Sequence, residues 1–320
     1  MPAKPSLAGF FLTFGVLVAN MKKTSFSKPM RVMILEMLDF PGMGSLSHFP
    51  NLLYLVEVLA LLILSKYLFG AVHRFSLEDQ LVKEDNKAVT IYFTAFVGSV
   101  ALILEGVLEG PSAGLLIGML DLALWAFIGI ALLLVAGWLN DRFILRGIDA
   151  KVEMLGKGNL AVTMVGAGSL VGSAAMIRAI VTGESLGWGL DIGLTLFYFV
   201  LGQLSFWVYA LIYQKITAYD DLAEIQSGNV AAGITLGMNL GAMGFLMSVP
   251  LSQSYSLLWY LAWFVVGNAT LLGFRFVMDV GLIPTQKLDQ EIHQDQNWGI
   301  AFLEGGFSVV AVLILQNIFG

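Results

Sequence analysis

Glu84-Asp85-Asn86-Lys87-Ala88 is the first occurrence of a pattern that returns three more times along this chain. The returns are Gly158-Asn159-Leu160-Ala161, Gly228-Asn229-Val230-Ala231 and Gln296-Asn297-Trp298-Gly299. Successive asparagines lie 73, 70 and 68 residues apart. The chain is therefore built on a repeat of about 70 residues, and these four residues, named the anchor asparagines below, mark its units.

A charged stretch precedes each anchor asparagine, and about twenty apolar residues follow it. Asparagine accepts a hydrogen bond from an otherwise unpaired amide at a helix N-terminus, so the pattern predicts four helix starts, each stabilised by about 1 kcal/mol. An alternative interpretation is that the four N-termini bind an anion or a lipid headgroup through free amides. A small residue lies two positions after each asparagine, at Ala88, Ala161, Ala231 and Gly299.

The composition indicates that the chain lies in a membrane. Of its 320 residues, 58% are hydrophobic and 12% are charged, and the mean hydropathy is +0.81; these values lie outside the range of soluble globular proteins. The net charge of -6 and the absence of a basic stripe give no indication of a nucleic-acid partner. With no cysteine, and with His48, His73 and His293 far apart in sequence, we expect neither a metal site nor a cofactor.

Apolar stretches of spanning length occur eight times after residue 48. Long polar connections that contain the anchor asparagines alternate with very short connections, so two spans and one long connection make one repeat. We expect an all-α integral membrane protein of about eight transmembrane helices in four parallel two-helix repeats. The predicted spans are about 51–72, 88–108, 113–137, 159–181, 189–213, 229–251, 256–278 and 297–319.

Three regions follow from this division. Residues 1–48 form an N-terminal segment, in which the apolar run 6–19 is a signal-like segment, an interfacial helix or a short span, and 31–38 resembles a surface helix. The first membrane half covers residues 49–185 and holds two repeats. The second half covers residues 186–320 and holds the other two.

Charge in the connections predicts the orientation. The long connections hold eleven lysines and arginines, whereas the short ones hold only Arg178, so the positive-inside rule predicts that the anchor asparagines face the cytoplasm. Each repeat has an even number of spans, which gives all four repeats one orientation. Such repeats would close a pseudo-fourfold ring or pair into two halves related by a twofold, and either arrangement places a shared axis where a pathway could run.

From Tyr213-Gln214-Lys215-Ile216-Thr217 through Gly228-Asn229-Val230-Ala231-Ala232, the chain resembles the domain-of-unknown-function family numbered 350, the YjfL-like bacterial inner-membrane proteins with four spans. The resemblance is clearest over residues 190–320, and residues 50–185 resemble a second, more diverged copy. It implies a tandem duplication in a bacterial cytoplasmic membrane. Asn297 departs from the family pattern because Gly299 replaces the alanine. The family carries no established activity, and its members resemble accessory proteins of envelope stress and transport.

Polar residues inside spans are the candidates for a pathway, because an ionisable group in hydrocarbon is costly and normally faces a partner or water. Glu304 lies about 10 Å past the start of its helix, and Asn239 lies about 15 Å past the start of its own. Glu57 and Gln203 complete the set of pathway candidates. Arg275 is a candidate for a further partner of these groups, but its place near the cytoplasmic end of a span makes snorkelling to the interface the simpler interpretation.

Carboxylates gather at the opposite ends of the spans. Asp121 and Asp191 are one repeat apart and should occupy matching places near the outer ends of two spans. Together with Glu105 and Glu109 they would form an acidic outer mouth that attracts cations. The alternative interpretation is that they complement helix dipoles at ordinary helix starts.

These observations favour a channel-like or transporter-like protein for a cation or a proton. The alternative is a non-transporting scaffold or assembly subunit in the envelope stress response, whose glycine-rich helix faces pack against a partner membrane protein or a second copy. No catalytic motif is present, so we expect no enzymatic activity, although a membrane enzyme using Glu304 or Glu57 stays open. The expected partners are membrane lipids and a homo-oligomer or another membrane protein, without nucleic acid.

Overall fold

Long apolar helices make up most of the molecule. The computed structural model describes residues 49–110, 114–182, 186–284 and 286–319, so the expectations for residues 1–48 lie outside it. Contacts group residues 55–320 into one unit, which is the unit described below. Eight helices in the described ranges are long and apolar enough to cross a membrane, and this confirms the predicted all-α multi-pass class.

Each repeat has a long outer helix, a short connecting element on the side of the anchor asparagines (the anchor side), and a long core helix that starts after the asparagine. The outer helices are α3 (Phe49–His73), α5 (Leu115–Leu139), α8 (Trp188–Ile216) and α11 (Leu257–Val277). The core helices are α4 (Lys87–Glu109), α7 (Leu160–Val181), α10 (Val230–Gln253) and α13 (Trp298–Phe319). The connecting elements are the π-helical turns η2 (Asp79–Lys83), η3 (Asn140–Ile144) and η4 (Met278–Leu282) and the helices α6 (Ala150–Lys157), α9 (Asp221–Ser227) and α12 (Leu288–His293).

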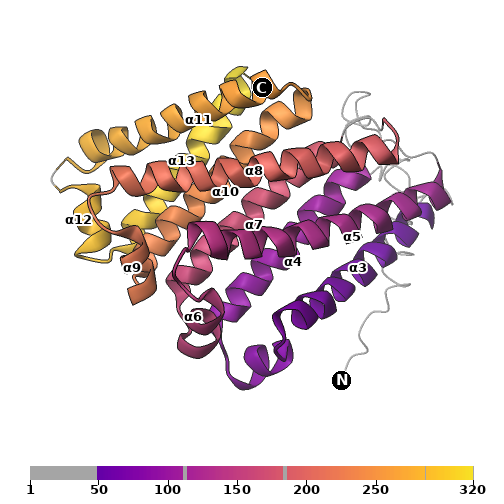
Figure 1. Cartoon of the computed structure of the whole chain (residues 1–320), viewed down its shortest axis with the longest axis horizontal. Coiled ribbons are helices and arrows are strands. Elements are labelled where there is room, and N and C mark those ends of the chain that lie inside the picture. Colours follow the sequence, from indigo (N-terminus) through magenta and orange to yellow (C-terminus); the bar gives the residue numbers. More distant parts are fainter. Residues whose placement is uncertain (1–48, 111–113, 183–185, 285, 320) are drawn as a thin grey trace, which may run out of the picture. The chain divides into compact units, whose positions relative to one another are not determined.

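The core helices form an open row in sequence order. The helix α4 packs against α7, α7 against α10, and α10 against α13 (Figure 1). In addition, α5 packs on both α4 and α7, α8 on both α7 and α10, and α11 on both α10 and α13. Of the two arrangements expected from the sequence, the closed ring is therefore wrong for the described part of the chain: α4 and α13 are the ends of the row, and the four repeats do not surround a shared axis.

Glycine explains why the row is densest at its centre. A Cβ atom on Gly168 of α7 would lie 1.8 Å from the carbonyl oxygen of Gly237 in α10, and one on Gly244 would lie 2.2 Å from the Cα of Gly172. Only glycine permits backbones to approach this closely, and in lipid such packing takes the place of a hydrophobic driving force between helices. The two halves predicted from the sequence therefore share their tightest interface.

Candidate functional site

The anchor asparagines begin the four core helices as predicted. The Oδ1 atom of Asn229 accepts hydrogen bonds from the backbone N–H groups of Ala231 and Ala232 at 3.1 and 3.3 Å, and the other three anchor asparagines accept equivalent pairs. These bonds already occupy the first-turn amides that an anion or headgroup would need.

The side-chain amide of each anchor asparagine has a second role that the sequence reasoning missed. Its Nδ2 atom donates to a carboxylate or amide oxygen five or six residues earlier, on Gln80, Glu153, Glu224 and Glu291. In the first three repeats it also donates to a backbone carbonyl of the following repeat, on Met154, Ile225 and Ile292, at 3.0, 3.0 and 2.8 Å. The recurring Gln or Glu was the available signal, whereas the carbonyl partners lie too far along the chain to be read from the pattern.

Glu304 lies at the centre of a buried charged cluster. Its side chain is 2% exposed, and its Oε1 atom accepts hydrogen bonds from the Tyr213 hydroxyl at 3.1 Å and from the Arg275 guanidinium. Arg275 also pairs with Asp289 at 2.5 Å and donates to the Tyr213 hydroxyl at 2.7 Å. The Arg275 side chain is 12% exposed, so the snorkelling interpretation is wrong: the guanidinium points inward to two carboxylates.

Asn239 continues this polar set deeper into the membrane. Its Oδ1 atom accepts hydrogen bonds from the hydroxyls of Tyr209 and Ser308 at 3.0 and 2.7 Å. Tyr209 and Tyr213 are one turn apart on α8, with ring centroids separated by 6.1 Å. The structure thus brings together Glu304 and Asn239, two of the four pathway candidates, through tyrosines that the sequence reasoning did not select.

The other two pathway candidates lie elsewhere. The side-chain amide of Gln203 donates to the Ser173 hydroxyl at 2.9 Å, which ties α8 to α7. Glu57 is on α3, and its Oε2 atom is buried without a hydrogen-bond partner among the described residues. Neither residue shares a hydrogen bond with Glu304 or Asn239 in the described part of the chain.

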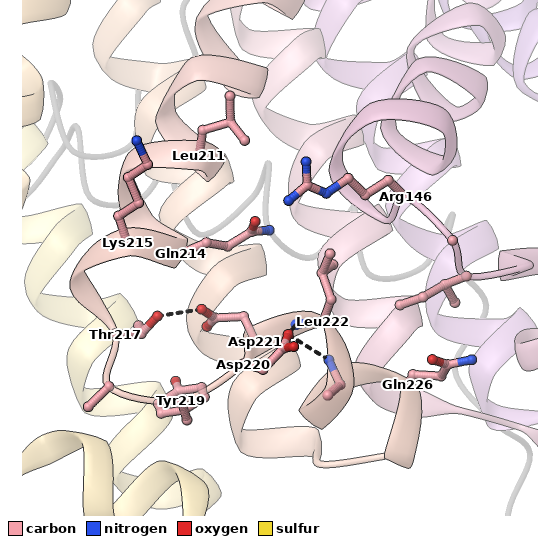
Figure 2. A pocket seen from close by; sticks show the side chains of 14 residues that line it. Arg146, Leu211, Gln214, Lys215, Thr217, Tyr219, Asp220, Asp221, Leu222 and Gln226 are labelled. Atoms are coloured by element: carbon pink, nitrogen blue, oxygen red, sulfur yellow. Dashed lines mark hydrogen bonds between the residues drawn. The ribbon is translucent and has the colours of Figure 1, made fainter.

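A pocket of about 700 Å³ opens on the anchor side (Figure 2). Figure 2 shows Arg146 reaching it from the first half of the chain, while Lys215, Thr217 and Asp221 come from the second half. The Thr217 hydroxyl donates to Asp221 at 2.5 Å. Burial raises the pKa of Asp221 to about 6, partly offset by this hydrogen bond and by the Arg275 charge. Asp221 therefore lines the pocket, and its pKa also responds to the charge of Arg275 in the buried cluster.

Unpaired oxygens occur at three places around this site. The Oε2 of Glu304, the Oδ1 of Asp221 and the hydroxyl of Tyr219 are buried and lack hydrogen-bond partners among the described residues. A buried polar atom without a partner is costly, and it indicates that a proton, a water or a cation can complete its bonding. Groups of three or more histidine, aspartate and glutamate side chains suited to a metal ion do not occur in the described ranges.

The four carboxylates at the helix ends away from the anchor side have ion-pair or hydrogen-bond partners. Arg178 pairs with Glu105 and, at 2.7 Å, with Glu109. Asp121 accepts a hydrogen bond from the indole of Trp188 at 3.0 Å. Asp191 accepts one from a backbone N–H group at 3.0 Å. Asp121 and Asp191 lie near the starts of α5 and α8, and Arg178 offsets part of the acidic charge at this side.

Comparison with known proteins identifies the family. The family model described as Domain of Unknown Function (DUF350) matches residues 43–181 and again 184–319. The UPF0719 transmembrane protein YshE of Bacillus subtilis (strain 168) is 31% identical over 112 residues, which are 35% of this chain and 82% of that protein. No solved structure matches the chain. The chain is thus a multi-pass membrane protein that contains the DUF350 domain twice and belongs to this family of unknown function.

Proposed function

We propose that this protein carries a proton or a small cation across the membrane through its second half, with Glu304 as the exchanging group. The observation that carries the proposal is that only one of the two oxygens of the buried Glu304 carboxylate has hydrogen-bond partners among the described residues. Its Oε1 atom accepts hydrogen bonds from Arg275 and Tyr213, while its Oε2 atom is buried and has no hydrogen-bond partner in the part of the chain that the structure describes. A carboxylate kept in hydrocarbon with one open oxygen is typical of ion and proton pathways.

Arg275 gives this exchange a physical basis, because it contacts two carboxylates, Glu304 and Asp289. A proton or cation that binds Glu304 weakens one of these ion pairs, and the guanidinium keeps the other. The charge of Arg275 therefore stays compensated in both states, which keeps the cost of exchange low. Asp221, beside the anchor-side pocket, supplies a second titratable group between water and the cluster.

Flux into proteoliposomes tests this proposal. Under gradients of protons, Na⁺ and K⁺, the wild-type protein should carry at least one of these ions, and Glu304→Gln should reduce that flux about tenfold or more. Glu78→Gln is the matched control, because Glu78 is exposed on the anchor side, and it should leave flux unchanged. A wild-type protein that is folded and carries none of these ions would contradict the proposal.

A second candidate function is a non-transporting scaffold that packs against a membrane-protein partner. It is favoured by the open row of core helices, which encloses no axis within the described residues, and by the complete pairing of Arg275 inside the protein. A scaffold predicts no flux from either wild type or Glu304→Gln, together with a partner protein that co-purifies from the membrane. We propose no enzymatic reaction for either candidate.

We further propose that the protein lies in the bacterial inner membrane with its anchor side in the cytoplasm, since the long connections on that side hold most of the lysines and arginines. The chain has no cysteine, so Ser76→Cys introduces a single thiol on the anchor side, at an exposed position. A membrane-impermeant maleimide should label it only after the cells are broken. Labelling in intact spheroplasts would show that the anchor side faces outward and would contradict the proposed orientation.

A further inference from the structure

Contacts between the core helices α7, α10 and α13 follow one rule when positions are counted from the anchor asparagine. In the α7–α10 pair, Gly233, four positions after its asparagine, meets Ala161, two positions after its own. Likewise Gly237, at position eight, meets Gly168, at position nine. The front flank of a core helix, which faces the following repeat, is therefore defined by positions 2, 9 and 13. The back flank, which faces the preceding repeat, is defined by positions 4, 8 and 15.

The contact between α10 and α13 follows the same rule. There, Gly305 at position eight would place a Cβ atom 2.5 Å from Met238 at position nine. Between α4 and α7, the back-flank residues Thr163 and Ala174 are buried, and a Cβ atom on the neighbouring Gly166 would lie 2.6 Å from the Tyr92 ring of α4. The interface between α7 and α10 thus recurs between α10 and α13.

At each end of the row, one flank of the core helix has no further core helix packed against it in the described ranges. On α13 the front flank consists of Gly299, Gly306 and Val310; Gly299 is exposed, Val310 is 45% exposed, and no neighbouring atom lies within 4 Å of a Cβ placed on Gly306. On α4 the back flank begins with Thr90 and Thr94, which are exposed. Ala101 completes that flank and is half-buried. Both flanks have small or β-branched residues that suit close helix packing in lipid.

Asn297 provides an independent sign that a following repeat belongs on this side. The other anchor asparagines donate to a carbonyl of the next repeat at 2.8 to 3.0 Å. Within the ranges that the structure describes, Asn297 bonds only with its own repeat, through Glu291 and the first-turn amides. The equivalent carbonyl before α4 is that of Leu81, in the turn η2.

At the other end of the row, α3 packs less closely than the other outer helices. Each of α5, α8 and α11 packs closely on two core helices, whereas α3 contacts α4 through Phe69, whose ring lies beside those of Tyr92, Phe93 and Phe96. In its most apolar stretch, 17% of the residues of α3 are buried, against 28% to 50% of the residues in the same stretch of the other three outer helices. A core helix placed on the back flank of α4 would give α3 a second core helix to pack on.

We propose that two copies of this chain associate head to tail, with the front flank of α13 in one copy packed on the back flank of α4 in the next. The contact continues an interface that the chain already makes between α7 and α10 and between α10 and α13, and it gives Asn297 the carbonyl of Leu81 in the second copy. Because the two surfaces differ, the contact is heterologous, and it generates a ring when the rotation closes or a longer row when it does not.

Disulfide cross-linking in membranes tests this proposal, since the chain has no cysteine of its own. Thr94→Cys and Gly306→Cys place thiols at positions eight and nine, which meet in the internal interfaces. Oxidation with copper phenanthroline should link the two single variants when they are co-expressed, and should link the double variant into dimers and longer species. A lipid-facing control pair, Leu120→Cys with Leu261→Cys, should give at least tenfold less cross-linked product; both positions are exposed.

Ala101→Cys with Val310→Cys, at positions fifteen and thirteen, is a second pair that should cross-link in the same way. The proposal is overturned if both pairs stay monomeric on oxidation while the unmodified protein has the native mass of one chain. It is also overturned if either single variant cross-links with itself as efficiently as the mixed pair does, because self-linking indicates a twofold interface rather than a head-to-tail one.

Discussion

At the residue scale, the anchor asparagine joins local and long-range structure in one side chain. Its oxygen caps a helix, and this half of its role is readable from sequence because cap and helix are neighbours in the chain. Its nitrogen bonds a carbonyl of the next repeat, which no local pattern specifies. Asparagine satisfies both needs because its amide offers an acceptor and two donors, whereas aspartate would offer only acceptors.

Replacing Asn229 should therefore cost more than replacing Asn297. Asn229→Ala removes a cap, worth about 1 kcal/mol, and leaves the Ile292 carbonyl without its donor, worth a further ~1 to 3 kcal/mol. Asn297→Ala removes the cap without a bond to a following repeat within the chain. Urea unfolding in detergent micelles, at a dilution where the native mass is that of one chain, should separate the two variants by about 1 kcal/mol or more. Equal losses would show that the bond between repeats adds nothing.

The same scale explains why Glu304 and Asn239 were found from sequence and their partners were not. An isolated acid or amide in an apolar span stands out in the sequence, whereas Tyr209 and Tyr213 look like ordinary apolar positions of a helix. Their hydroxyls turn toward Asn239 and Glu304 only because α8, α10 and α13 pack in one particular rotation. The preferred interpretation placed the Arg275 guanidinium at the membrane interface, because the sequence does not show that two carboxylates, on Glu304 and Asp289, pair with it inside the protein.

Asp221 should make stability depend on pH. Its pKa is raised to about 6 in the folded protein, above the ordinary value near 3.9, so the folded state favours the protonated carboxyl. The contribution is fully present below about pH 4 and is lost as the pH rises through about 6, by up to about 3 kcal/mol. Relative to Asp221→Asn, wild type should lose unfolding free energy between pH 4 and 7. Parallel curves for the two proteins would contradict this assignment, and exposed Glu78→Gln should run parallel to wild type.

At the element scale, the connecting segments and the glycine flanks set the geometry of the row. The residue before every anchor asparagine has a positive φ, from 48° to 93°, at Asp85, Gly158, Gly228 and Gln296. A left-handed residue ends the connecting element and turns the chain so that the asparagine can start the next helix. Helix spans were predictable from hydropathy and their starts from asparagine. The π-helical turns were not, because no residue type in η2, η3 or η4 specifies a π-helical turn over an α-helical one.

Close glycine packing makes a sharp prediction at this scale. Gly168→Ala places a methyl group 1.8 Å from a backbone carbonyl oxygen of α10, and because backbone cannot move aside cheaply it should destabilise the protein by about 3 kcal/mol or more. Gly273→Ala is the matched control: Gly273 is exposed on α11 with no neighbouring atom within 4 Å, so alanine should stabilise by about 0.5 to 1 kcal/mol. Thermal unfolding in detergent compares them, and a tolerated Gly168→Ala would mean that α7 and α10 lie further apart.

At the scale of the whole molecule, the repeat was predictable and its arrangement was not. The spacing of the asparagines and the even number of spans gave four parallel units, as observed. Whether such units form a ring or a row depends on which flanks of each helix carry the contact. The row results because the front and back flanks lie on opposite sides of each core helix, as Gly237 shows by meeting α7 while Met238 meets α13. The buried charges are therefore enclosed by α8, α10, α11 and α13, within the second half, instead of lining an axis shared by all four repeats.

The central claim is that Glu304 binds and releases a proton or cation inside this second half. Infrared difference spectroscopy of the protein in lipid, titrated with acid and then with Na⁺ or K⁺, observes its carboxyl group directly. Wild type should show a carboxyl band that changes with pH or with one of these ions, and the band should be missing in Glu304→Gln and retained in Glu57→Gln. Identical difference spectra for wild type and Glu304→Gln would mean that Glu304 stays locked to Arg275, and the proposed exchange would be wrong.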